Sequence, residues 1–141
     1  MLIAAMSVAA VLAGSAPSVA NGLVTIAPGE SVVISLGPQG PVVADDTVLT
    51  KRENRPWGDG VRLKFSETAD GGQTVLTVGY DRPVDYEARM FNAAGQNATT
   101  SICVVKPHMF SIEHWPHPIA RLELSNFTFV SGMADDVMKC D

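Results

Sequence analysis

The chain has 141 residues, with 46% hydrophobic and 18% charged side chains and a formal net charge of −5. A chain of this length predicts one ordinary domain with a core of its own. Nucleic-acid binding is not expected, because the only dense basic group, at residues 51–55, is interrupted by Glu53 and the acidic chain offers no basic patch.

The first 20 residues predict a secretory signal. They carry no charged side chain, are rich in Ala, Val and Leu, and end on Ser18-Val19-Ala20, the small-x-small pattern of a cleavage site. The run is too short and too rich in alanine for a membrane span, and Ser15 stands where a lipoprotein signal needs a cysteine. We expect cleavage after Ala20 and a mature domain, residues 21–141, in the periplasm or outside the cell, with no membrane span and no lipid anchor.

Short runs of β-branched and aromatic residues recur after this leader, separated by turn residues, and no window of about 12 residues keeps the apolar spacing of a helix. The pattern predicts an all-β chain. The expected strands are 23–26, 31–36, 42–49 (with a break at Asp45-Asp46 as an alternative), 61–67, 73–80, 84–92, 99–106 and 119–130.

The clearest alternation lies in 61–66, where Val, Leu and Phe share one face and Arg, Lys and Ser share the other. Asp70-Gly71 then leads into 73–78, and Asp-Gly between two strand patterns is the strongest short-range signal for a hairpin. The strands at 84–92 and 99–106 follow through a turn at 93–95, and we expect all four strands to form a meander.

The last strand carries a conflict of parity. Leu122 and Leu124 fall on one face, while Phe127 and Phe129 fall on the other, so a regular strand cannot bury all four side chains. A β-bulge near Ser125-Asn126 would resolve the conflict.

Two cysteines occur, Cys103 and Cys140. In an oxidising compartment an even count predicts a disulfide in preference to a reactive thiol or a pair of metal ligands. Ile102 and Val104 are expected to face the core, so Cys103 should point away from it. The polar tail at 131–141 is too short to pack alone, and Cys140 is its expected tether.

About seven or eight such strands predict an antiparallel two-sheet β-sandwich, immunoglobulin-like in architecture. The cysteine spacing departs from that of antibody domains, and a likeness of architecture implies no function. No Gly-x-Ser-x-Gly elbow occurs, and no serine stands beside a plausible base and orienter, so neither an enzyme nor a cofactor is expected.

All three histidines fall within a short stretch, near potential carboxylate and thioether ligands. The set consists of His108, His114 and His117, with Glu113 and Met109 beside them and Met133 or Met138 further off. Imidazole and thioether ligands suit copper or zinc. Because the spacing fits no known metal motif, we favour exposed histidines in a polar connection and keep a metal site as the alternative.

The connection at 107–118 is predicted to be an ordered loop, because three prolines restrict it and strand alternation is not evident there. Trp115 lies in it, and Trp57 stands beside another proline; each is either a ligand platform or a plug that closes the sandwich. Phe110 and Ile112 add apolar surface, and at least one large side chain must pack on the sandwich. We expect Trp115 to be the exposed contact, with His114 and His117 as its polar rim.

These features predict a non-enzymatic extracytoplasmic domain that binds another protein or an envelope component through its end loops or an exposed edge strand. The alternative is a periplasmic copper- or zinc-binding protein that uses His108, His114 and His117.

Overall fold

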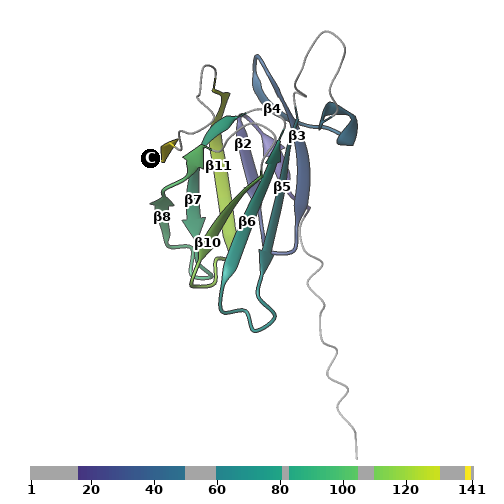
Figure 1. The fold of residues 1–141 in the computed structure, drawn as a ribbon. Helices are drawn as coiled ribbons and strands as arrows, with labels where there is room; N and C mark the ends of the chain where they lie inside the picture. Colours follow the sequence, from purple (N-terminus) through teal and green to yellow (C-terminus); the bar gives the residue numbers. More distant parts are fainter. Residues whose placement is uncertain (1–15, 50–59, 81–82, 105–109, 131–138, 141) are drawn as a thin grey trace, which may run out of the picture.

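Alternating apolar and polar side chains favour strands in this chain, and the turn residues between these runs end the strands. The computed structural model describes residues 16–49, 60–80, 83–104, 110–130 and 139–140. Within these residues two antiparallel five-stranded sheets pack against each other as a β-sandwich (Figure 1).

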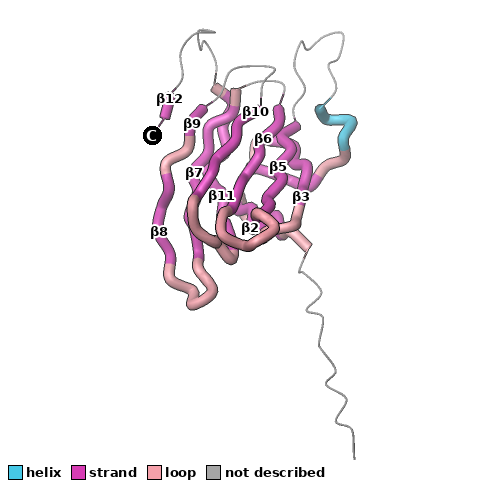
Figure 2. The backbone as a smooth tube through the Cα atoms, turned by 60° about the horizontal axis from the view of Figure 1, so that its bottom comes forward, coloured by secondary structure: helices cyan, strands magenta, loops and turns pink. Residues whose placement is uncertain are grey.

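Sheet A contains, in spatial order, β1 (Ser18–Ala20), β2 (Leu23–Ile26), β11 (Arg121–Phe129), β7 (Val84–Phe91) and β8 (Asn97–Thr100). Sheet B contains β10 (Phe110–Trp115), β6 (Thr74–Tyr80), β5 (Gly60–Glu67), β3 (Ser31–Gly37) and β4 (Gly40–Val43). A short ladder joins β9 (Cys103–Val104) to β12 (Lys139–Cys140), beside the end of sheet A (Figure 2). The one helical turn in the described residues is the 3-10 helix η1 (Asp46–Leu49).

The core lies between the two sheets and is filled by the inward side chains of both. The side chains that are fully buried include Val24, Ile26, Ile34, Val61, Leu63, Phe65, Leu76, Val78, Leu122 and Leu124. The two-sheet sandwich predicted from the sequence is therefore confirmed. The immunoglobulin likeness is not confirmed, because each sheet has five strands, whereas constant-type immunoglobulin domains have four and three.

The hairpin predicted at 61–78 is present. β5 and β6 pair over seven residues on each strand, from Val61 opposite Tyr80 to Glu67 opposite Thr74. Gly71 has a φ of 68°, a backbone conformation that glycine adopts without strain. The strand predicted at 42–49 is wrong beyond Val43, where β4 ends, because Asp46–Leu49 form the 3-10 helix η1. The alternative of a break at Asp45-Asp46 locates the interruption, but no strand follows it before η1 ends.

The predicted four-strand meander is wrong. β5 and β6 belong to sheet B, whereas β7 and β8 belong to sheet A, so the chain crosses between the sheets after β6. The second edge of β6 is occupied by β10, and the second edge of β7 is occupied by β11. Local alternation identifies each strand but does not say which distant strand will pair with it.

The predicted β-bulge in the last strand is confirmed. The register between β11 and β7 shifts between Ser125 and Thr128, and Asn126 takes a positive φ of 55°. Phe127, on the far side of the shift, stacks on the buried Tyr86 with ring centroids 5.4 Å apart. The extra residue thus lets both halves of the strand place apolar side chains against the sandwich.

The predicted disulfide joins Cys103 to Cys140. Ile102 and Val104 are buried on either side of Cys103, whose own side chain is half-buried. Cys103 therefore points away from the core, as predicted, and β12 pairs with β9 with Cys140 directly opposite Cys103.

Strand β1 was not expected, because its residues were assigned to the end of the leader. Asn21 and Gly22 form the turn between β1 and β2 with φ angles of 53° and 78°, and positive φ at both positions is the requirement of a type I′ hairpin turn. The backbone of Gly22 also lies close to the β3–β4 turn, where a Cβ on Gly40 would be 3.4 Å from the Gly22 Cα. Cleavage after Ala20 stays a prediction, and it would remove β1.

A chain that begins at Asn21 is therefore expected to be less stable than one that begins at Ala16, by about 1–2 kcal/mol. The shorter chain loses the ladder of β1 and the partly buried Val19, which packs against the core. Urea denaturation of the two chains measures the difference, and N-terminal sequencing of the exported protein shows which chain exists. Equal midpoints would mean that β1 adds nothing to the fold.

Candidate functional site

The segment at 110–115 is a strand and not the loop predicted from the sequence. β10 pairs with β6 across six residue pairs and forms one edge of sheet B. Its alternation is inverted, since the polar Ser111 is buried at 5% exposure while Phe110 and Ile112 face outward. A search for apolar side chains on the core face misses such a strand.

The expectation that Trp115 is an exposed contact is also wrong. Trp115 is only 7% exposed and packs edge-on against Phe65, with ring centroids 6.5 Å apart. Its indole Nε1–H donates a hydrogen bond to Thr100 Oγ1 at 2.9 Å. The side chain therefore acts as the predicted plug, joining the edge of sheet B to the β8 edge of sheet A.

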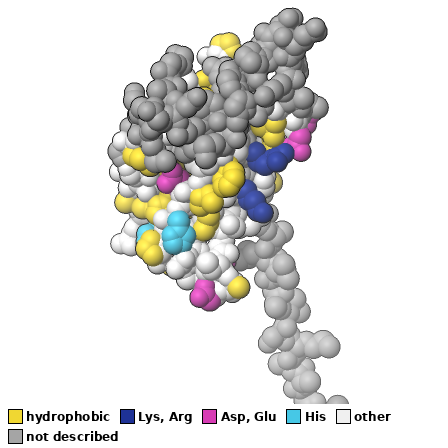
Figure 3. All heavy atoms as spheres, viewed as in Figure 1, with side chains coloured by type: hydrophobic (Ala, Val, Ile, Leu, Met, Phe, Trp, Pro, Cys, Tyr) yellow, Lys and Arg dark blue, Asp and Glu magenta, His cyan; other side chains and the backbone are white. Residues whose placement is uncertain are grey.

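The large exposed apolar side chains of β10 are Phe110 and Ile112, at 62% and 56% exposure. The strand register places Phe110 beside Gly79 and Gly79 beside Arg62, and it places Ile112 beside Thr77 and Thr77 beside Lys64. Apolar, small and cationic positions thus follow one another across three strands. Figure 3 shows apolar atoms next to Lys and Arg atoms on this face of the molecule.

We call the outward side chains of β10, β6 and β5 the β10 face. They are Phe110, Ile112, His114, Val75, Thr77, Gly79, Arg62, Lys64 and Ser66. These positions carry two cations and no carboxylate, although the chain as a whole has a net charge of −5. The β10 face is therefore a locally basic surface on an acidic protein.

The two cations differ in their surroundings. Arg62 pairs with Asp46 of η1 at 3.0 Å, and both side chains are exposed. Lys64 forms no ion pair within the described part of the chain. An exposed ion pair contributes little to stability, so Arg62 can exchange its partner at low cost. Lys64 has no ion-pair partner to give up among the described residues.

The histidines are placed as follows. His114 is exposed on the β10 face, and its Nε2 lies 2.6 Å from Gln73 Oε1. His117 is exposed beyond the end of β10, and its carbonyl accepts a hydrogen bond from Thr74 Oγ1. Among the described residues no group of three potential metal ligands occurs. His108 lies outside the described residues, as does Trp57, so their predicted roles stay predictions.

Glu113 ties β10 to the disulfide-bearing segment. Its Oε1 accepts a hydrogen bond from the Cys103 N–H at 3.2 Å. Burial raises the pKa of the Glu113 carboxyl above its ordinary value, and the hydrogen bond from Cys103 acts in the opposite direction. This hydrogen bond thus links the β9 segment to the β10 strand.

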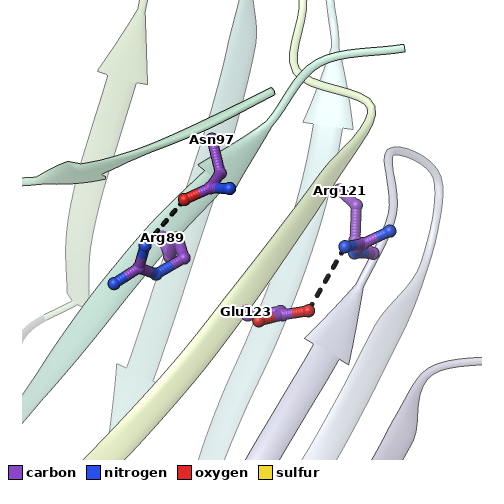
Figure 4. Close-up of polar contacts among 4 residues, drawn as sticks. All are labelled: Arg89, Asn97, Arg121 and Glu123. Atoms are coloured by element: carbon purple, nitrogen blue, oxygen red, sulfur yellow. Dashed lines mark hydrogen bonds and ion pairs between the residues drawn. The ribbon is translucent and has the colours of Figure 1, made fainter. Parts of the chain in front are cut away.

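Two arginines on the opposite outer surface, on sheet A, have side-chain partners (Figure 4). Arg89 donates a hydrogen bond to Asn97 Oδ1 at 2.6 Å, and Arg121 pairs with Glu123 at 3.3 Å. The Arg121 guanidinium also lies over the Phe91 ring, 3.9 Å from its centroid. The charge of Arg121 is therefore offset by Glu123, whereas the neutral Asn97 amide leaves the charge of Arg89 in place.

A cavity of about 280 Å³ opens where the β7–β8 hairpin meets the segment after β10. It is lined by Met90, Phe91, Asn92, Gln96, Asn97, Ala98, His117, Pro118 and Ile119. Its lining holds a single titratable side chain, His117.

No protein-family model, curated protein or solved structure matches this chain. Within the described residues no helix has the length and apolar character that a membrane crossing requires. Of the predicted binding residues, Phe110 and His114 share the β10 face, whereas Trp115 is buried. Arg62 and Lys64 were predicted to share an outward face but were not linked to β10, because nothing in the local sequence shows that β10 pairs with β6.

Proposed function

We propose that this chain is a non-enzymatic extracytoplasmic domain that binds a protein partner through its β10 face. The observation that carries the proposal is the exposure of Phe110 and Ile112 side by side on an edge strand. Contiguous exposed apolar side chains mark interaction sites more often than single ones do, since they favour association. Edge strands are normally protected from such contacts, which makes apolar side chains there a feature that needs a reason.

The proposed compartment rests on two independent observations. The apolar segment at the start of the sequence predicts export, and the disulfide between Cys103 and Cys140 is consistent with an oxidising environment. Aromatic and aliphatic anchors with a polar surround are typical of protein interfaces, and His114, Thr77 and Lys64 supply that surround here.

Site-specific photo-crosslinking tests the proposal. A benzophenone amino acid in place of Phe110, in protein exported by living cells, is expected to give a discrete protein adduct. The same group in place of Thr99, which is exposed on sheet A, is the matched control and is expected to give none. No adduct at position 110 above the level at position 99 would contradict the proposed function.

A further inference from the structure

Resting on this proposed function, we infer that the partner presents an extended segment with one apolar edge and one acidic edge, which lies along β6. The apolar edge contacts Phe110 and Ile112, and the acidic edge contacts Arg62 and Lys64.

The segment would lie over Thr77 and Gly79 of β6, which are smaller than the residues of β10 and β5 beside them. Gly79 has none, and a Cβ built there would meet only the Cβ of Arg62, at 4.0 Å. Glycine inside a strand weakens it and often marks a place where another backbone approaches closely. The other outward residues of β6 are Val75 and Thr77. The outward side chains of β10 and β5 lie on the two sides of this row. Adjacent strands lie about 4.8 Å apart, so these two flanks are about 10 Å apart, which is room for one extended chain.

The spacing along the row of outward β6 residues matches an extended partner. Phe110 and Ile112 are two residues apart on β10, and Arg62 and Lys64 are two residues apart on β5, so each pair repeats at about 6.8 Å. An extended chain directs alternate side chains to opposite sides with that same repeat. One side of the segment can then be apolar throughout while the other side is acidic throughout.

The charges of Arg62 and Lys64 favour a different protein over a second copy of this chain as the occupant of the β10 face. A second copy docked by the same face would offer Lys64 no carboxylate from the outward positions of these three strands, and the neighbouring Asp46 carboxylate is already paired with Arg62. Like charges across an interface oppose association, whereas opposite charges guide it. The net charge of −5 also repels a second copy as a whole.

The test combines the crosslinker at position 110 with charge reversal. Lys64→Glu is expected to lower the yield of the adduct about tenfold, because it replaces an attraction with a repulsion. Arg89→Glu is the matched control, since Arg89 is an exposed cation on sheet A, and it is expected to leave the yield unchanged. Mass spectrometry of the adduct should locate a partner segment with acidic and apolar residues at alternate positions. Replacing its acidic residues with lysine should restore the yield with the Lys64→Glu chain.

The other outcomes each overturn the inference in a distinct way. An adduct that persists with Lys64→Glu leaves the proposed function in place and removes the acidic partner. No adduct from position 110 in the unaltered chain removes the proposed function itself. Flotation with vesicles of phosphatidylglycerol and phosphatidylethanolamine in equal parts is expected to show no binding. Vesicle binding that Lys64→Glu abolishes, without a protein adduct, would assign the β10 face to a membrane surface.

Discussion

Replacing Trp115 with alanine is expected to lower the free energy of unfolding by about 3–5 kcal/mol. The substitution leaves a cavity where the indole packs edge-on against Phe65, and it removes the hydrogen bond to Thr100 that joins the edges of the two sheets. Because a domain of this size has about 5–15 kcal/mol of net stability, the loss is a large share of the total. Urea denaturation at neutral pH, followed by far-UV circular dichroism, measures it.

Two variants make this result specific. Trp115→Phe keeps most of the apolar volume and loses the indole N–H, so it should cost clearly less than alanine, with Thr100 left without its donor. Ile112→Ala changes an exposed side chain of the same strand and should stay within about 0.5 kcal/mol of the unaltered chain. A Trp115→Ala variant as stable as Ile112→Ala would show that Trp115 is not buried.

The second large effect is expected from the disulfide. Replacing both Cys103 and Cys140 with serine should lower the free energy of unfolding by up to about 4 kcal/mol, the chain-entropy value for a loop of this length. β12 pairs with β9 through only two residue pairs, so the covalent link is the main constraint that keeps Cys140 beside Cys103. Urea denaturation of the double variant measures the loss.

The unaltered chain, denatured with and without a reductant, is the control for the serine substitutions themselves. The reduced chain and the double serine variant should have the same midpoint. Mass spectrometry of the exported protein should show the loss of two hydrogens relative to the reduced form. Two free thiols in that protein, or a double variant that loses less than about 1 kcal/mol, would contradict the stabilising role of the disulfide.

Strands with a conventional pattern were predictable because their alternation is a local property. The alternation in 61–66 and the Asp70-Gly71 turn establish the β5–β6 hairpin without any knowledge of the rest of the chain. The opposite parities of Leu124 and Phe127 likewise require a bulge between them, and the register shift lies there. Inward Ile102 and Val104 likewise direct Cys103 outward.

The errors arose where the outcome depends on distant pairing or on an inverted pattern. β10 buries the polar Ser111 and exposes the apolar Ile112. Its apolar side chains therefore lie on the opposite face from those of an ordinary core strand. The turn at Asn21-Gly22 is a hairpin signal by the same rule that identified the one at Asp70-Gly71, but its first strand was assigned to the leader. The β10 face as a site requires the pairing of β10 with β6, which only the folded chain shows.

The position of β11 in sheet A also constrains when the domain can fold. β11, near the end of the chain, lies between β2 and β7, and Leu122 pairs with Ile26 near the start. Sheet A therefore has no continuous hydrogen-bonded ladder until residues past 120 are available to the rest of the chain. Such non-local pairing gives a high contact order, for which folding takes milliseconds to seconds. Sheet A of a chain still being synthesised therefore cannot be completed until β11 has emerged, whereas all five strands of sheet B precede β11 in the sequence.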